Sequence, residues 1–392
     1  IRDTPTTLED WTLAERGLDR LAAARSIDPL MMDEIRLIRT EIEIDRGRDA
    51  AARELFRTMG GLTSWWFHEP VALEELTDFD EVAVTPPAEF EWRATPGTDP
   101  SGWVRVSGLA WPPQRQMAYL ATTVVSDREQ PVAVRVGAAQ VARVWLNGVE
   151  LLTTPQPLDR APDQAVGGGW LREGENAVVI AVASEDERWW LRARLTRPDG
   201  SAIDGVREIR QPPSLYPPIG TESPEVRELG LEIRTAVAEG TSQAAMALAA
   251  FLVARHPEPV GGGGVRAACR DARAEMPGEA RLLEWLVTTE PGAARNLLSE
   301  ALKEDPDLLW ARLELAAWYG ERGLYEQAHS LLADTDSKGA VIRGAMLDVD
   351  AALWGPLVVP KMAELGREFP NCVRVNIGLA EAAIESRRWD LA

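Results

Sequence analysis

An internal period of helical segments constrains the fold of this chain more than any other feature of its sequence. The repeat units at 226–259 and 275–308 each span 34 residues, and helix-breaking prolines close units at Pro257, Pro306 and Pro370. The units that follow are 309–338, a less regular one to residue 372, and a truncated one from 373. Such a period predicts a solenoid, in which each unit buries its apolar face against the next.

The N-terminal residues 8–58 also show helical spacing of apolar side chains. The segment Ser26-Ile27-Asp28-Pro29 separates two helical stretches with residues typical of helix caps and breaks, and a second turn at Asp45-Arg46-Gly47-Arg48 leads into another helix. We therefore expect a short helical region ahead of the next domain.

Between these helical parts the chain has short alternating apolar runs separated by Pro, Gly and Asp. Val132 to Val136 places valines on one face of a strand, and the Asn147-Gly148 pair joins two more such runs. Asn-Gly between alternating runs is a strong hairpin signal, because both turn residues must take positive φ. Further strands are expected at 177–182 and 189–195. Together they predict an antiparallel sandwich.

The predicted fold class is a multidomain α plus β protein, with an antiparallel β-sandwich of the jelly-roll type flanked by helical repeats. Pro-rich residues near position 213 favour an extended spacer between the two. The expected domains are a helical region at 1–59, the sandwich at 60–210, a Pro-rich linker at 211–223 and the repeats at 224–392.

The C-terminal units resemble the tetratricopeptide repeat. Small residues recur where two helices of a unit would touch, at Ala245, Ala294 and Ala328. The best match runs from Leu309 to Thr335 and keeps the register at Leu315, Ala316, Tyr319, Gly323, Tyr325, Ala328 and Leu332. Residues 33–58 fit the pattern loosely, so a single N-terminal repeat is a further expectation.

The resemblance implies a concave groove lined by the first helix of each unit. It assigns nine residues to partner binding: Arg227, Arg234, Glu279, Leu283, Leu286, Trp310, Leu313, Arg374 and Glu381. An apolar centre flanked by charge suits an amphipathic helix or an extended peptide. Large aromatic and Arg side chains are the usual anchors of such contacts. The alternative is that the groove packs against the sandwich or against its own next helix.

The sandwich segment is similar to the galactose-binding-like β-sandwich, on the evidence of Arg143 to Glu150 followed by Leu171 to Ile180. That resemblance implies a jelly roll, and in some members a carbohydrate site on the loops. The combination with tetratricopeptide repeats resembles the N-terminal half of bacterial envelope proteins that carry a transglutaminase-like domain further along. It therefore implies a cell-envelope or periplasmic location, with the cytoplasm as the alternative.

Composition argues against several classes of function. The formal charge of −20 disfavours nucleic-acid binding and docking on an anionic membrane surface. No apolar run is long enough to insert into a membrane. Two cysteines and three histidines leave little material for a metal centre or a catalytic dyad. We therefore expect no enzyme activity, no cofactor and no metal.

Individual candidates for chemistry have simpler interpretations. Cys269 and Cys372 lie among Ala and Val and are expected to be buried hydrophobes, and His256 is expected to cap a helix. Gly167-Gly168-Gly169 and Gly261 to Gly264 are expected to be loops. Two acidic clusters suit either a structural calcium ion or a solvated loop: Asp78, Asp80 and Glu81, and Glu185, Asp186 and Glu187.

Fifteen tryptophans are an unusual number, and two adjacent pairs, Trp65-Trp66 and Trp189-Trp190, fall in predicted strands. Neighbouring residues on a strand face opposite sides, so one of each pair should lie in the core. The other should cover a helix, a loop or a ligand.

The sequence thus predicts a non-catalytic scaffold or adaptor that binds a protein or peptide through its repeat groove. Two alternatives remain: a carbohydrate-binding envelope module that uses the sandwich, or the non-catalytic N-terminal half of a transglutaminase-like enzyme.

Overall fold

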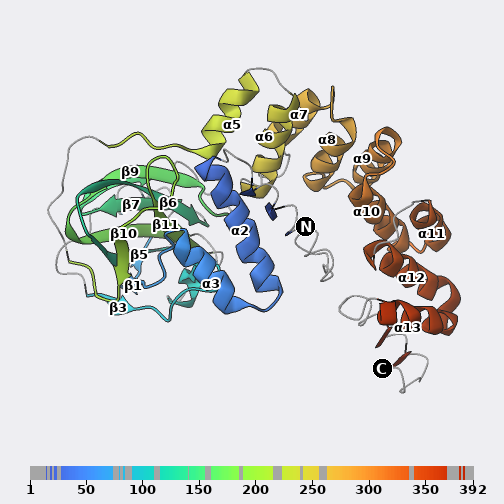
Figure 1. Ribbon diagram of the computed structural model, residues 1–392, viewed down its shortest axis with the longest axis horizontal. Coiled ribbons are helices and arrows are strands. Elements are labelled where there is room, and N and C mark those ends of the chain that lie inside the picture. Colours follow the sequence, from blue (N-terminus) through green and yellow to red (C-terminus); the bar gives the residue numbers. More distant parts are fainter. Residues whose placement is uncertain are drawn as a thin grey trace. The chain divides into compact units, whose positions relative to one another are not determined.

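The computed structural model of the chain consists of two compact units (Figure 1). The sandwich unit comprises 22–235 and 254–257, and the helical unit comprises 1–21, 236–253 and 258–392. The structure describes, apart from a few isolated residues, 28–73, 91–109, 115–139, 141–154, 160–184, 189–214, 223–238, 242–255, 263–334 and 340–368.

The sandwich unit contains two antiparallel sheets. The larger, eight-stranded sheet has the order β3-β1-β5-β10-β7-β8, with β2 and β12 also pairing with β5, and the four-stranded sheet has the order β4-β11-β6-β9. The larger sheet consists of β1 (Trp66–Phe67), β2 (Val71–Ala72), β3 (Arg93–Ala94), β5 (Gln116–Ser126), β7 (Val141–Leu146), β8 (Val149–Thr153), β10 (Gly174–Ser184) and β12 (Val206–Ile209). The smaller sheet consists of β4 (Val104–Arg105), β6 (Gln130–Ala138), β9 (Ala165–Leu171) and β11 (Trp190–Thr196).

The apolar core lies between the inner faces of these sheets. Val132, Val134 and Val136 of β6 pack there with Ile180 and Leu191. This is the alternation that the sequence predicts, and it confirms a sandwich of antiparallel sheets. A second apolar cluster covers the other face of the larger sheet and includes Tyr119 and Trp145, together with Leu73, Phe79 and Ala83.

The predicted Asn-Gly hairpin joins β7 to β8. Asn147 and Gly148 take φ values of 50° and 80°, which is the positive-φ turn that twisted antiparallel strands favour. The Asn147 side chain also donates to Asn176 Oδ1 at 2.8 Å, which ties the turn to the start of β10.

The prediction of a loop at Gly167-Gly168-Gly169 is wrong, because these residues lie inside β9 and pair with β6. The reason is close packing of backbones rather than chain flexibility. A Cβ on Gly168 would lie 2.3 Å from the Pro224 carbonyl oxygen, and one on Gly167 would lie 2.8 Å from Leu151 Cβ. Glycine in a strand commonly marks such an approach. The second glycine run is in part helical, since α7 begins at Gly263.

Two N-terminal helices pack on the outer face of the smaller sheet, α2 (Pro29–Asp45) and α3 (Asp49–Thr58) (Figure 1). The predicted start of α2 is confirmed, because the Asp28 side chain caps it by accepting from Leu30 N at 2.9 Å. The Phe56 ring of α3 is fully buried. It lies so close to Gly61 and Gly102 that a Cβ on either residue would overlap it.

The helical unit is an array in which consecutive helices pack against one another. Its helices are α6 (Ser242–Arg255), α7 (Gly263–Ala272), α8 (Pro277–Leu286), α9 (Pro291–Glu304), α10 (Leu309–Gly320), α11 (Tyr325–Ala333), α12 (Ala340–Trp354) and α13 (Val359–Glu368), with a 3-10 turn η3 (Gly355–Val358). Helix α5 (Leu229–Ala238) spans the boundary between the two units. Among the described helices, none is long and apolar enough to cross a bilayer.

Two helices of this unit begin with proline, and α9 ends at Glu304, two residues before Pro306. Pro277 and Pro291 stand at the first turns of α8 and α9, a position that tolerates proline because its missing N–H has no intrahelical partner. Ala245, Ala294 and Ala328 are buried, as their predicted role at helix contacts requires. Helix α7 falls in the interval between the first two predicted units, so it belongs to neither of them.

Candidate functional site

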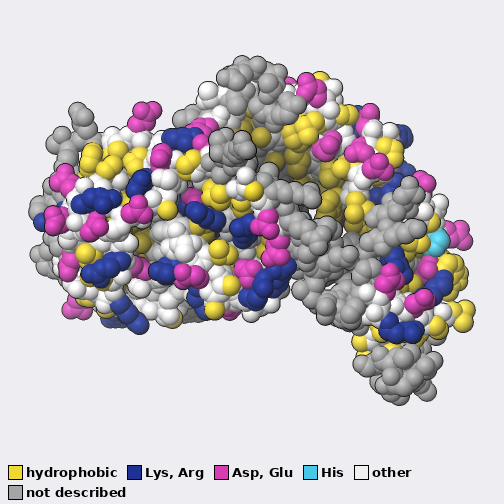
Figure 2. Space-filling view, in the orientation of Figure 1, with side chains coloured by type: hydrophobic (Ala, Val, Ile, Leu, Met, Phe, Trp, Pro, Cys, Tyr) yellow, Lys and Arg dark blue, Asp and Glu magenta, His cyan; other side chains and the backbone are white. Residues whose placement is uncertain are grey.

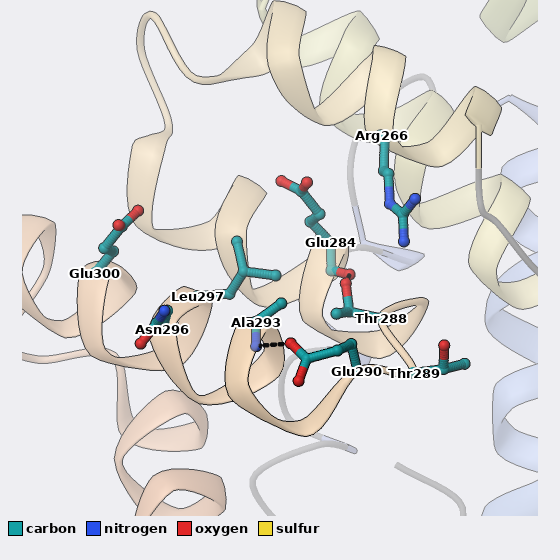
Figure 3. Close-up of a pocket in the computed structure, with 9 residues that line it drawn as sticks. All are labelled: Arg266, Glu284, Thr288, Thr289, Glu290, Ala293, Asn296, Leu297 and Glu300. Atoms are coloured by element: carbon teal, nitrogen blue, oxygen red, sulfur yellow. Dashed lines mark hydrogen bonds between the residues drawn. The ribbon is translucent and has the colours of Figure 1, made fainter.

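An open pocket of about 540 Å³ lies in the helical unit between α7, α8 and α9 (Figure 3). Arg266 of α7 lines one side, and one face of α9 lines the other. The full lining comprises Arg266, Glu284, Thr288, Thr289, Glu290, Ala293, Asn296, Leu297 and Glu300.

The start of α9 forms part of the pocket because of its local sequence. The Glu290 carboxylate caps the helix by accepting from Gly292 N at 2.9 Å and from Ala293 N. These two backbone hydrogen bonds lower the pKa of Glu290. Beyond the cap, helical spacing brings Ala293, Asn296, Leu297 and Glu300 onto one face of α9.

The three carboxylates of the pocket already have partners. Glu284 pairs with Arg273, and Glu300 accepts from Arg281 Nε at 3.0 Å, while Glu290 serves as the cap of α9. Within the described part of the chain, no ion pair engages Arg266. The uncommitted guanidinium and the polar side chains of Thr289 and Asn296 are therefore the groups offered to a ligand.

The four residues predicted as the apolar centre of the groove have different surroundings. Leu313 is buried in a cluster with α11 and α12, and Leu283 packs on a different cluster with α6 and α7. Leu286 and Trp310 are exposed, at 43% and 41%. Glu279 is half-buried on α8. The pocket uses another face of α8, since Glu284 is rotated by about 100° from Leu283.

The remaining predicted groove residues lie elsewhere. Arg227 belongs to the sandwich unit, where its guanidinium donates to Glu232 at 2.5 Å and to Asp28 at 2.8 Å. These hydrogen bonds raise its pKa. Arg234 lies in α5, and Arg374 and Glu381 lie outside the described residues.

The tryptophan pairs of the sandwich divide as predicted. Trp65 and Trp189 are buried in the core between the sheets, and Trp66 and Trp190 are half-buried. Trp190 faces outward from β11 and is covered by cations, because the Arg160 guanidinium lies 4.2 Å and that of Arg105 5.7 Å from its ring centroid.

Trp190 belongs to an aromatic–guanidinium stack, a run of alternating rings and cations in the order Arg105, Trp190, Arg160, Trp103, Arg192, Phe56. Arg160 lies 4.7 Å from the Trp103 centroid, and Arg192 lies 6.0 Å from Trp103 and 4.5 Å from Phe56. Each contact attracts a cation to an aromatic face. The stack was not predicted, although the Trp-x-Arg alternation at Trp190-Leu191-Arg192 placed both side chains on one strand face.

The described residues contain neither a candidate metal site nor an accessible thiol. No group of three or more His, Cys, Asp or Glu side chains in that part of the chain is arranged to hold a metal ion. Cys269 is fully buried among Ala and Val side chains. The two acidic clusters, Cys372 and His256 fall outside the described residues.

No protein-family model matches the chain, and no curated protein does. Solved structures align with parts of it at low similarity. A family 35 carbohydrate binding module from an environmental isolate covers 24% of this chain and 72% of its own, with 15% identity and a TM-score of 0.20. One from Clostridium thermocellum covers 34% and 92%, with 13% identity and a TM-score of 0.18. A β-glucosidase from Kluyveromyces marxianus covers 47% of this chain and 18% of its own, with 12% identity and a TM-score of 0.25. Such scores assign no ligand or activity to this chain.

Proposed function

We propose that this chain is a non-catalytic binding protein whose helical unit holds a segment of a protein partner. The observation that carries this proposal is the open pocket between α7, α8 and α9. Its polar groups Arg266, Thr289 and Asn296 suit the carbonyl oxygens and acidic side chains of an extended peptide, because they supply hydrogen-bond donors beside the apolar Leu297.

We also propose that the pairs α8/α9 and α10/α11 are tetratricopeptide repeats. Their bounds fall within the units at 275–308 and 309–338, and buried alanines occupy the helix contacts in both pairs. In an array of this kind, short antiparallel pairs expose one face to a partner. The exposed Leu286 and Trp310 are then additional contact residues.

A photo-crosslinking amino acid at Asn296 tests the main proposal. We expect it to capture a defined protein from a lysate of the source cells, and a peptide from the crosslinked region to bind the purified chain. Arg266→Glu should weaken binding of that peptide about tenfold. A crosslinker at the exposed Glu326 of α11 and the variant Glu326→Ala are the matched controls. If Arg266→Glu and Glu326→Ala bind the peptide equally well, the pocket is not the site.

Saccharide binding by the sandwich is a second candidate function. The half-buried Trp190, which lies at the accessible end of the aromatic–guanidinium stack, favours it. An indole ring presents a large rigid apolar surface with a polar N–H, which suits the mixed surface of a sugar.

Location in the bacterial cell envelope and a role as the N-terminal half of a transglutaminase-like enzyme remain proposals that depend on the resemblances in the sequence. The absence of enzyme activity is likewise a proposal. A test of the purified chain for hydrolysis of aryl glycosides would contradict it if turnover were found.

A further inference from the structure

Two arginines, Arg105 and Arg160, lie at the accessible end of the aromatic–guanidinium stack, although the whole chain has a formal charge of −20. Arg105 is exposed, and 40% of the Arg160 side chain is exposed. Asp99 pairs with Arg160 at 3.3 Å. Arg105 forms no ion pair within the described residues. Basic and acidic side chains are interspersed over the visible face of the sandwich unit (Figure 2).

The stack holds these guanidiniums in place before any ligand arrives. Its inner members Trp103, Arg192 and Phe56 are all buried, so the Trp103 ring against which Arg160 lies cannot move away. Arg105 is also oriented by a hydrogen bond from its Nε to Ser107 Oγ at 3.3 Å. A guanidinium fixed in this way loses little conformational entropy when it pairs with an oxyanion.

We propose that Trp190, Arg105 and Arg160 bind one acidic sugar unit, a pyranose that carries a carboxylate or sulfate group. The planar fork of Arg matches both oxyanions, since two parallel N–H donors meet two oxygens. The part of the half-buried Trp190 side chain that the two guanidiniums leave exposed contacts apolar C–H groups of the sugar. The charge of −20 disfavours a highly charged polymer and favours a ligand with few charges. This inference depends on the second candidate function.

Isothermal titration calorimetry on the full chain tests the proposal with methyl glucuronide, glucose 6-sulfate, methyl glucoside and sodium acetate. We expect at least one acidic sugar to bind about tenfold more tightly than methyl glucoside, which lacks the charge. Arg105→Gln and Arg160→Gln should each remove about that factor. The control is Arg93→Gln, an exposed arginine of β3 that pairs with Glu69 at 2.7 Å, and it should bind as the natural chain does.

The outcomes separate the inference from the function on which it depends. If methyl glucoside binds as tightly as both acidic sugars, the sandwich binds saccharides but the role of charge is refuted. If acetate binds as tightly as methyl glucuronide, the site recognises an oxyanion alone and the sugar assignment is wrong. If no sugar binds while circular dichroism shows a folded chain, both the inference and saccharide binding fail. Peptide binding by the helical unit is unaffected by any of these results.

Discussion

Arg194 of β11 donates to Asp33 of α2 at 2.5 Å, and both side chains are almost completely buried. Asp163 accepts from the same guanidinium at 2.6 Å. Burial alone would lower the pKa of Arg194, but the two carboxylates outweigh it and raise the pKa. The N-terminal helix is thus joined to the smaller sheet by a charged group enclosed in the unit.

Removing one carboxylate from this cluster should destabilise the sandwich unit. Asp33→Ala leaves the buried Arg194 with Asp163 as its remaining ion-pair partner, and we expect a loss of about 2 kcal/mol in the free energy of unfolding, measured with urea. Arg194→Met combined with Asp33→Ala should lower the free energy of unfolding by less than the sum of the single changes, because the double variant buries no guanidinium that has lost a carboxylate partner. Glu54→Ala breaks an exposed pair on α3 and should leave the midpoint unchanged. If the loss in free energy of unfolding for the double variant equals the sum for the two single variants, this account is wrong.

Glycine at position 102 is needed for the approach of α3 to the sandwich. Its φ is +89°, and a Cβ there would lie 1.9 Å from Phe56 Cε1. Gly102→Ala should therefore lower the free energy of unfolding by about 2 kcal/mol or more, because it adds both backbone strain and overpacking. Gly97→Ala is the matched control, since Gly97 also has positive φ but has open space around its missing Cβ. Equal melting temperatures for the two variants would show that the contact with Phe56 is unimportant.

The thiol of Cys269 should be unreactive in the folded chain. Burial, aided by Glu284 and opposed by Arg273, raises its pKa to about 11. At pH 8 only about one thiol in a thousand is then ionised, and the thiolate is the reactive form. Iodoacetamide should leave Cys269 unmodified in the native chain and alkylate it in urea, as mass spectrometry of its peptide would show. Rapid modification of the native chain would mean that the thiol is accessible.

Asp350 of α12 should make the stability of the helical unit depend on pH. Burial raises its pKa, although His329 at 3.2 Å and Lys361 at 3.8 Å act in the opposite direction. A raised pKa means that the folded state holds the proton more tightly. Its contribution to stability is then complete below the ordinary pKa of a carboxyl group and is lost as pH rises through the raised value.

The variant Asp350→Asn tests this dependence. It should unfold at a higher urea concentration than the natural chain at pH 7, and the difference should shrink as the pH falls toward 4. Glu364→Gln, which changes an exposed carboxylate of α13, should show no such trend. If the difference in urea midpoint between Asp350→Asn and the natural chain grows as the pH falls, the pairing with His329 outweighs the effect of burial.

Much of the local structure was predictable because it depends on residues close together in the chain. Asn147-Gly148 specified a hairpin, since few residues tolerate positive φ. Asp28 and Pro29 specified the start of α2. The tryptophan pairs specified one inward and one outward ring, because side chains alternate along a strand. The helical period did not show that Leu283 and Leu313 pack in separate apolar clusters, because that depends on which helices lie next to them.

Only the tertiary structure decided the features that depend on residues far apart. Gly167 to Gly169 form a strand by pairing with β6, and glycine is needed there because other segments approach too closely for a Cβ. Trp190 is covered by Arg105 and Arg160, which come from two other segments of the sandwich unit. Sequence periodicity reports which side of its own element a residue faces. It does not tell which distant residues pack against that side, because the packing of the whole unit decides this.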